Sequence, residues 1–271
     1  MVDNSAKQAV VLAAGFGSRL RPLTDLRPKP LVEVNGTPIL HNALRNLEAV
    51  GVEEVTIVVG YRKDAIEYSC GRRFRSLEIS YVESDVFDRT GSAYSLWLAR
   101  HVLLTGNTYI LEGDVYFEPD ALRRLATSQS KNVAAVALFG ASMEGSAAIL
   151  TNHGHIAELR MGQTAENLTD GSPQLFKTMN LIRFSGEDLR TTIVPHLDDL
   201  MRAGAVKSYC EELLSQLVQQ KGLQIAAVRC DDLKWYEIDS EEDLMIAEGI
   251  FAPEGLMAAQ PLVAGVQQVK P

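Results

Sequence analysis

Short runs rich in β-branched residues alternate with longer helical patterns in the N-terminal part of the chain. The strand-like runs are 9–12, 55–59, 79–82 and 108–111, and the helical patterns are 38–50 and 91–102. This alternation is typical of βαβ units and predicts an α/β fold with a doubly wound, mostly parallel sheet. Because ligands bind beyond the carboxyl ends of the strands in such sheets, we expect functional residues directly after strands.

The pattern changes after residue 132, where strand-like pieces are separated by polar turns. These pieces are 133–138, 147–150, 156–159 and 175–184, and they predict a small inserted antiparallel portion. Further helical patterns at 186–203, 209–221 and 241–248, with a strand at 224–229, complete a domain that we expect to span 1–250. The remainder, 251–271, is rich in Ala, Gly, Val and Pro and predicts a C-terminal arm or linker.

The net charge and the cysteine content limit the possible partners and the cellular compartment. A formal net charge of −9 argues against nucleic acid and anionic membrane surfaces, since both attract a basic face. An anionic small molecule would then need local Lys and Arg side chains or a bound cation, which points to a metal. Three cysteines without metal-ligand spacing favour a reducing cytoplasm. We expect neither a targeting segment nor a membrane span, and leave the oligomeric state open, with a homodimer as one alternative.

The glycine-rich string LAAGFGSRLRPLT, 12–24, directly follows the first strand. Gly15 and Gly17 allow a tight turn that presents backbone N–H groups to phosphate oxygens, and Ser18 adds a hydroxyl donor. Arg19 is expected to clamp the outer phosphates of a nucleotide. The nucleotide-binding candidates from this string are Leu12, Ala13, Ala14, Gly15, Gly17, Ser18 and Arg19.

Lys29 lies between Pro28 and Pro30, where the backbone is restricted. We expect its ammonium to neutralise charge that grows at an α-phosphorus during transfer. The whole string differs from a Rossmann fingerprint because Arg19 lies inside the loop and a PKPL element follows it. It differs from a Walker loop because GK followed by Ser or Thr is missing.

This composite string resembles the NTP-transferase superfamily, which includes sugar-1-phosphate nucleotidyltransferases and phosphocholine cytidylyltransferases. The resemblance implies a Rossmann-like nucleotidyltransferase fold and a catalytic domain. The alternative interpretation is that the string forms a glycine-rich turn with only a structural role.

A second motif, YILEGDVYF, runs from an apolar strand into a carboxylate at 109–117. Asp114 at a strand's carboxyl end is the first candidate ligand for Mg²⁺. The alternative, a capping Asp, suits Asp120 after Pro119 better. A third motif is KWYEID, 234–239, where the resemblance assigns Asp239 as the second metal ligand. Glu237 lies on the same face of the predicted strand and is the alternative metal ligand. The other interpretation of Asp239 is that it is the N-cap of the helix that follows.

Four segments resemble one branch of the superfamily, the phosphocholine and 2-aminoethylphosphonate cytidylyltransferases. They are TGSAYSLWLAR at 90–100, EGDVYF at 112–117, FKTMNLIRFS at 176–185 and DLKWYEIDSEEDLMIAE at 232–248. The resemblance implies transfer of CMP from CTP to a small phosphonate or phosphate ester, with release of pyrophosphate. Thr90 and Ser92 occupy the base-contacting position, where the family commonly has Asn. A sugar-1-phosphate nucleotidyltransferase and a non-catalytic nucleotide-binding module are the alternatives.

A cationic acceptor needs aromatic faces or carboxylates around its head group. Lys177 is a candidate to bind the acceptor's phosphonate or phosphate oxygens. The alternative is that its side chain lies in solvent at the edge of a strand. No histidine lies in the motifs, and none is required, because a phosphate acceptor is already mostly dianionic at neutral pH. The candidates for the head group are Tyr116, Tyr209, Trp235 and Tyr236 as faces, and Glu211 or Asp232 as counter-charge.

Overall fold

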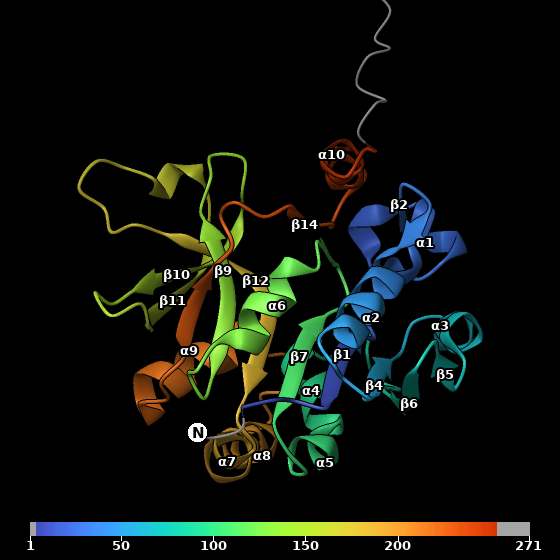
Figure 1. The fold of residues 1–271 in the computed structure, drawn as a ribbon, viewed down its shortest axis with the longest axis horizontal. Coiled ribbons are helices and arrows are strands. Elements are labelled where there is room, and N and C mark those ends of the chain that lie inside the picture. Colours follow the sequence, from blue (N-terminus) through green and yellow to red (C-terminus); the bar gives the residue numbers. More distant parts are fainter. Residues whose placement is uncertain (1–3, 254–271) are drawn as a thin grey trace, which may run out of the picture.

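A large mixed sheet forms the centre of the molecule in the computed structural model, which describes residues 4–253 (Figure 1). Its order is β11-β10-β12-β7-β1-β4-β6-β5, with β9 and β13 joined beside β12. The parallel half consists of β1 (Gln8–Ala13), β4 (Glu54–Val59), β6 (Leu77–Glu83) and β7 (Thr108–Glu112). These strands agree with the four that the sequence predicts, and the predicted fold class is confirmed.

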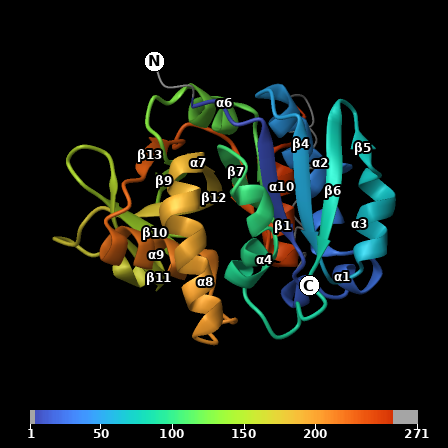
Figure 2. The same ribbon diagram turned by 90° about the horizontal axis from the view of Figure 1, so that it is seen from below.

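Helices cover both faces of the sheet, as expected for a doubly wound fold. One face packs against α2 (Ile39–Ala49), α3 (Lys63–Cys70) and α6 (Asp120–Thr127). The other packs against α4 (Ser92–Leu98), α5 (Arg100–Leu103), α8 (Val194–Arg202) and α9 (Cys210–Lys221). Figure 2 shows α4 and α8 in front of the sheet and α2 behind it. Alternate residues of β1 therefore enter two separate apolar cores, which explains its unbroken hydrophobic run.

The predicted antiparallel portion is confirmed, and it extends the same sheet. It contains β9 (Val133–Leu138), β10 (Gly145–Leu150), β11 (Ile156–Gln163) and β12 (Phe176–Phe184). Strand β13 (Ala226–Arg229) lies beside β9 and is parallel to it. Strand β12 pairs antiparallel with β7 and so connects the two halves. Its pairing with β9 is shifted between Thr178 and Ile182, and Asn180 within that shift has a positive φ of 53°.

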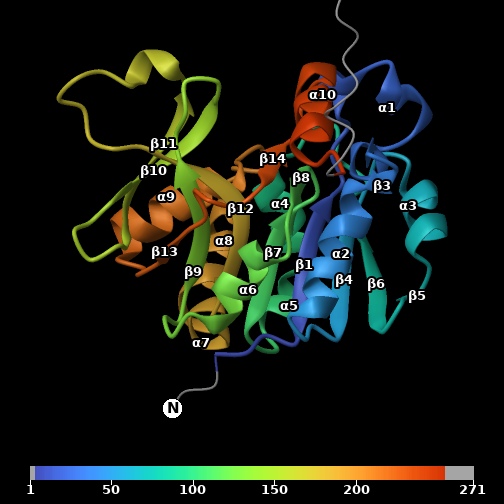
Figure 3. The ribbon, with the colours of Figure 1, turned by 45° about the horizontal axis from the view of Figure 1, so that its top comes forward.

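The C-terminal segment returns to the parallel half. Strand β14 (Trp235–Glu237) pairs antiparallel with β8 (Val115–Phe117), and α10 (Glu241–Ile250) follows it (Figure 3). The backbone N–H of Ile238 donates to the carbonyl of Asp114 over 2.9 Å. The EGDVYF and KWYEID motifs, far apart in the sequence, therefore lie side by side.

Several elements differ from the sequence prediction. The predicted helix 186–203 consists of α7 (Gly186–Asp188), a π-helical turn (Leu189–Ile193) and α8, while 91–102 divides into α4 and α5. The sequence analysis missed α3, α6, the short helix α1 (Leu23–Leu26), the edge strand β5 (Arg73–Phe74) and the small hairpin of β2 (Glu33–Val34) and β3 (Thr37–Pro38). These elements are short, so the sequence pattern has few residues in which to repeat.

The division at residue 250 stays a prediction. The ring of Phe251, the first residue of the predicted arm, packs against Tyr116 with 4.7 Å between ring centroids. The rest of the arm beyond residue 253 lies outside the described residues. None of the helices in residues 4–253 has the length and apolarity needed to cross a bilayer.

Candidate active site

The glycine-rich loop leaves the end of β1 and folds back onto Lys29. Gly17 has a φ of 63°, which favours glycine, and a Cβ there would lie 2.8 Å from the Cβ of Lys29. The Thr24 hydroxyl donates to the Gly17 carbonyl over 2.9 Å and holds the turn. Gly15 is different, because φ is not positive there and a Cβ would meet nothing within 4 Å. Gly17 therefore shapes the loop, whereas Gly15 leaves open space beside it.

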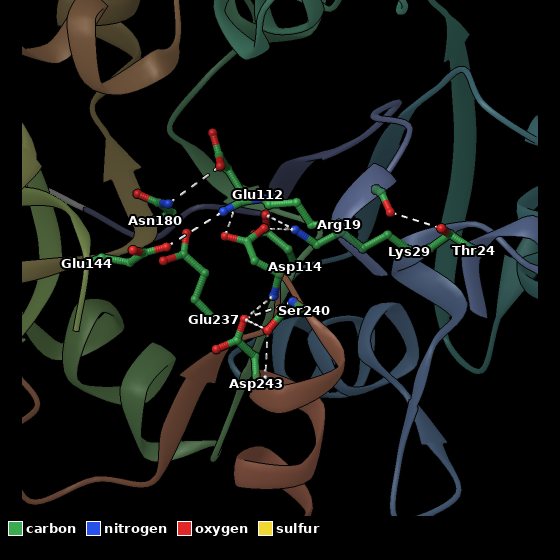
Figure 4. A network of polar contacts seen from close by, with 12 residues as sticks. Arg19, Thr24, Lys29, Glu112, Asp114, Glu144, Asn180, Glu237, Ser240 and Asp243 are labelled. Carbon is green, nitrogen blue, oxygen red and sulfur yellow. Dashed lines mark hydrogen bonds and ion pairs between the residues drawn. The ribbon is translucent and has the colours of Figure 1, made fainter. Parts of the chain in front are cut away.

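Lys29 lies between two carboxylates at the end of the loop. Its Nζ is 2.9 Å from Asp114 Oδ2 and 2.5 Å from Asp239 Oδ1, and Arg19 contacts Asp239 Oδ2 at 2.9 Å (Figure 4). Burial alone would lower the pKa of Lys29, but Asp114 and Asp239 outweigh it and the pKa is raised. Lys29 is thus a fixed positive charge at neutral pH.

The carboxylates of Asp239 and Asp114 differ in their surroundings. Burial would raise the pKa of Asp239, but Lys29 and Arg19 hold it below its usual value. Asp114 Oδ1 is buried and has no hydrogen-bond partner among the described residues. Such an orphaned acceptor in a native fold calls for a ligand or an ion.

Two alternative capping roles are wrong. Ser240, not Asp239, is the N-cap of α10, because its hydroxyl accepts the N–H of Asp243 over 3.2 Å. The N-cap of α6 is Pro119, so Asp120 lies inside that helix, where its carboxylate pairs with Arg123 at 2.7 Å.

A cavity of about 330 Å³ opens beside this cluster. It is lined by the end of β1 with the glycine-rich loop, by the segment that leads into α4 and by the end of β7 with the turn after it. Lys29, Pro30, Phe87, Tyr209 and Asp239 complete the lining. The predicted residues that it brings together are Leu12, Ala13, Ala14, Gly15, Gly17, Ser18, Arg19, Lys29, Thr90, Ser92, Asp114, Tyr209 and Asp239. The three motifs thus contribute to a single pocket at the carboxyl ends of the parallel strands, as the fold class predicts.

A smaller cavity of about 70 Å³ adjoins the first at Asp239 and contains other predicted acceptor residues. Trp235 and Tyr236 line it, together with Glu237 and Lys177. The Lys177 side chain is buried on β12, with Nζ 2.6 Å from Glu237 Oε2. The alternative of a solvated strand edge is therefore wrong for Lys177.

Three of the proposed acceptor residues line neither cavity: Tyr116, Asp232 and Glu211, which lies in the first turn of α9. Tyr116 is buried in a core cluster with Ile238 and stacks against Phe251, so its ring does not line either cavity. Strand alternation points its side chain into that core. Asp232 is exposed and forms a two-point pair with Arg124, at 2.7 and 2.6 Å.

Sequence reasoning missed Glu112 and Asn180. Glu112 is the last residue of β7 and lines the larger cavity, with Oε1 buried and unpartnered among the described residues. The Asn180 side-chain amide donates to Glu112 Oε2 at 3.5 Å. For Glu112 the available signal was a carboxylate at the end of the apolar run TYIL. Asn180 has no such signal, because FKTMNLIRF contains other polar residues as well.

Three carboxyl groups in this region have raised pKa values. Burial raises the pKa of Glu112 well above its usual value, and the Glu211 and Asp114 carboxylates add to the effect. Burial likewise raises the pKa of Glu211. Burial raises the pKa of Glu237 to about 7, despite the opposing charge of Lys177. These three carboxyl groups therefore hold their protons more tightly than exposed glutamates do.

A known protein family matches the part of the chain that contains the first two motifs. The model of the MobA-like NTP transferase domain matches residues 9–180, from β1 to Asn180 in β12, and so includes the glycine-rich loop, Lys29 and Asp114. The chain belongs to this NTP transferase family. The predicted superfamily is confirmed, whereas Asp239 and Glu211 lie beyond the matched residues.

Relatives of this NTP transferase include phosphonate enzymes. The chain is 34% identical over 252 residues to the CMP-5'-(3-aminopropyl)phosphonate synthase of Streptomyces rubellomurinus, covering 91% of this chain but 39% of that protein. The match to the 2-aminoethylphosphonate cytidylyltransferase of Lancefieldella rimae is 27% over 240 residues, covering 87% and 89%. The predicted resemblance to that branch is confirmed.

A solved structure shares the fold. The CTP:phosphocholine cytidylyltransferase of Streptococcus pneumoniae superposes with a TM-score of 0.72 at 21% identity, covering 90% of this chain and 99% of the other. At this identity the likeness concerns the fold of the NTP transferase domain alone.

Proposed function

We propose that the protein is a Mg²⁺-dependent cytidylyltransferase, which transfers CMP from CTP to a small phosphonate or phosphate monoester and releases pyrophosphate. The acceptors that we propose are 2-aminoethylphosphonate or phosphocholine. The observation that carries the proposal is the Lys29 ammonium between Asp114 and Asp239, at the mouth of a pocket built by the glycine-rich loop. The printed activities of the two phosphonate relatives support CTP as the donor.

Each group in the pocket has a task in this reaction. The backbone of the loop would hold the triphosphate, and Arg19 its outer phosphates. An acceptor oxygen attacks the α-phosphorus as the bond to the β-phosphate oxygen breaks, so pyrophosphate leaves. Lys29 would neutralise the charge that builds there. The acceptor dianion needs no base, which fits a pocket whose described lining contains no histidine.

The side chains fit a magnesium ion. Asp114 and Asp239 would hold it, since Mg²⁺ typically takes one or two protein carboxylates and completes its shell with water and phosphate oxygens. The unpartnered Asp114 Oδ1 is an available ligand atom. No group of three or more His, Cys, Asp or Glu residues with metal-site geometry is present in residues 4–253. When bound, the ion would supply charge neutralisation at the phosphates.

On the acceptor side we propose Lys177 as the clamp for the acceptor's charged oxygens. Tyr209, Trp235, Tyr236 and Glu211 would surround its head group. Burial of Lys177 against Glu237 supports this role, because a buried charge is costly unless it has a purpose in binding or folding. Thr90 and Ser92 line the larger cavity and remain our candidates for contacts with the base.

A pyrophosphate-release assay with four NTPs tests the proposal. Each NTP is combined with 2-aminoethylphosphonate, phosphocholine and glucose 1-phosphate, with and without Mg²⁺. We expect CTP with an amino acceptor to be much faster than any NTP with the sugar phosphate. Comparable kcat/KM for glucose 1-phosphate with UTP or dTTP would favour the sugar alternative, and no release with any pair would favour a binding module.

The remaining partners are proposals as well. The net charge of −9 supports the absence of a nucleic-acid or membrane partner and is compatible with a cytoplasmic protein. Light scattering during size-exclusion chromatography tests whether the protein is a homodimer.

A further inference from the structure

The side chain of Phe16, between the two glycines of the loop, is contacted from outside the pocket. Its ring lies 4.2 Å from the ring of Tyr61, measured between centroids, with the two planes tilted by 34°. The guanidinium of Arg21 lies over the Phe16 ring, with Cζ 4.8 Å from the centroid. Tyr61 belongs to none of the three motifs and does not line the larger cavity, whereas Phe16 does. A residue outside the pocket therefore contacts the part of the loop that borders it.

Tyr61 also binds the loop through hydrogen bonds. Its backbone N–H donates to the carbonyl of Ala14 over 3.0 Å. Its hydroxyl donates to the carbonyl of Thr24 over 3.0 Å, and the Thr24 hydroxyl donates in turn to the carbonyl of Gly17 over 2.9 Å. One residue thus holds three of the four positions at the start of the loop, one of them through Thr24.

The end of β4 fixes the place of Tyr61 itself. A Cβ at Gly60, the preceding residue, would lie 2.7 Å from the Ala14 carbonyl oxygen and 2.8 Å from Phe87 Cβ, so the chain approaches the loop as closely as glycine allows. Phe87 lines the larger cavity, and its ring lies 6.2 Å from the ring of Tyr61. Because β4 is paired on both sides, with β1 and β6, its end is a rigid support for the loop.

We propose that Tyr61 is a positioning residue for the nucleotide: through Phe16 and Thr24 it holds the glycine-rich loop in the conformation that binds the triphosphate. The inference rests on the proposed function and goes beyond it, because it assigns a role to a residue outside the pocket. A loop loses conformational entropy when its N–H groups bind phosphate oxygens, and a loop that is already ordered loses less. Tyr61 should therefore act on the affinity for CTP rather than on the chemical step.

The first test is the steady-state kinetics of CTP-dependent pyrophosphate release with 2-aminoethylphosphonate. We expect Tyr61→Ala to raise the KM for CTP about tenfold, which corresponds to the loss of an aromatic pair and a hydrogen bond. Tyr61→Phe keeps the ring and loses the contact of the hydroxyl, so it should raise this KM about threefold. In both variants kcat and the KM for the acceptor should stay within about twofold of the wild type, a split that a general loss of stability does not produce.

A double-mutant cycle tests whether Tyr61 acts through Phe16. Phe16→Ala alone should raise the KM for CTP about tenfold. Independent effects of Phe16→Ala and Tyr61→Ala would multiply to about 100-fold, whereas we expect the double variant to stay below about 30-fold. Tyr68→Ala is the matched control, because Tyr68 on α3 is 94% exposed, and it should behave like the wild type.

The second test requires neither an acceptor nor turnover. Trypsin cleaves after Arg19 when the loop opens, so the cleavage rate measures how often the loop leaves its place. Without ligand, Tyr61→Ala should be cleaved after Arg19 about tenfold faster than the wild type, relative to the other cleavage sites identified by mass spectrometry.

Several outcomes would overturn the inference while the wild type still turns over CTP and 2-aminoethylphosphonate. They are an unchanged KM for CTP in Tyr61→Ala, multiplication of the two effects in the double variant, and unchanged cleavage after Arg19. A wild type without cytidylyltransferase activity would overturn the proposed function instead. Faster cleavage of Tyr61→Ala would in that case still support the role of Tyr61 in ordering the loop.

Discussion

Replacing Lys29 with alanine is the sharpest test of the charge arrangement at the centre of the pocket. The ammonium is 13% exposed and bridges Asp114 and Asp239, at 2.9 and 2.5 Å. If its charge acts on the transition state, Lys29→Ala should lower kcat about 100- to 1000-fold, as for loss of one preorganised donor. The KM for CTP should change little, because the outer phosphates retain Arg19.

The same substitution has a predictable effect on stability. Removal of one partner from a buried ion pair lowers the free energy of unfolding by roughly 3 to 5 kcal/mol. Because Arg19 still pairs with Asp239 at 2.9 Å, we expect Lys29→Ala to lower it by about 2 kcal/mol at pH 7. Lys29 has a raised pKa, so its contribution is fully present below its unfolded pKa and is lost only when the pH rises through the folded value. Asp239 has a lowered pKa, so its contribution is present above its unfolded value near 3.8 and is lost as the pH falls through the folded value.

Steady-state kinetics and denaturant unfolding at pH 7 and pH 3 measure both effects. The stability difference between Lys29→Ala and the wild type should shrink at pH 3, because part of the contribution of Asp239 is lost below its unfolded pKa near 3.8. Lys131→Ala, which removes an exposed pair with Glu187 at 2.7 Å, is the control and should match the wild type in both assays. If Lys29→Ala raised KM and left kcat within threefold, Lys29 would be a ground-state anchor and the reasoning would be wrong.

Three further predictions concern the same pocket. Asp114→Asn and Asp239→Asn should each lower kcat by about 100-fold or more, with the fold intact by circular dichroism. EDTA should abolish turnover of the wild type, and Mn²⁺ should partly restore it. Near-normal turnover of either variant at saturating Mg²⁺ would remove that residue from the site. Arg19→Ala should raise the KM for CTP more than it lowers kcat, in contrast to Lys29→Ala, and the opposite split would exchange their roles. Gly17→Ala should lower the unfolding temperature, because φ is 63° and the new Cβ would lie 2.8 Å from Lys29, whereas Gly15→Ala should unfold like the wild type. Equal unfolding temperatures for the two glycine variants would contradict the strain at Gly17.

The parallel half of the fold could be predicted from the sequence because its strands are buried on both faces. The unbroken run in β1 and the similar run in β4 mark strands without reference to distant residues. Lys29 and Asp114 could be assigned to one pocket for a similar reason, since each belongs to a local motif. The position of Asp239 beside Asp114 depends on the pairing of β14 with β8, which no local pattern contains.

The acceptor side was harder to predict, because its residues meet only in the folded chain. Glu112 was visible within EGDVYF, but its orphaned oxygen results from the packing of β12 and α9 around it. Asn180 reaches it through a backbone conformation that a strand pattern does not reveal. Tyr116 illustrates the converse, since an aromatic residue beside a motif turned out to belong to the core.

The two sides of the pocket are therefore built by different parts of the chain. The loop after β1 and the ends of β7 and β14 hold the groups that any nucleotidyl transfer needs, a cationic side chain and two carboxylates. Of the proposed acceptor-side groups, Trp235 and Tyr236 come from β14 as well. Lys177 and Glu211 come from β12 and α9, which pack against β9 and β11. Because β12 and α9 contribute neither Lys29 nor its carboxylate partners, we expect substitutions in them to alter acceptor preference under the proposed function while the Lys29, Asp114 and Asp239 cluster is retained.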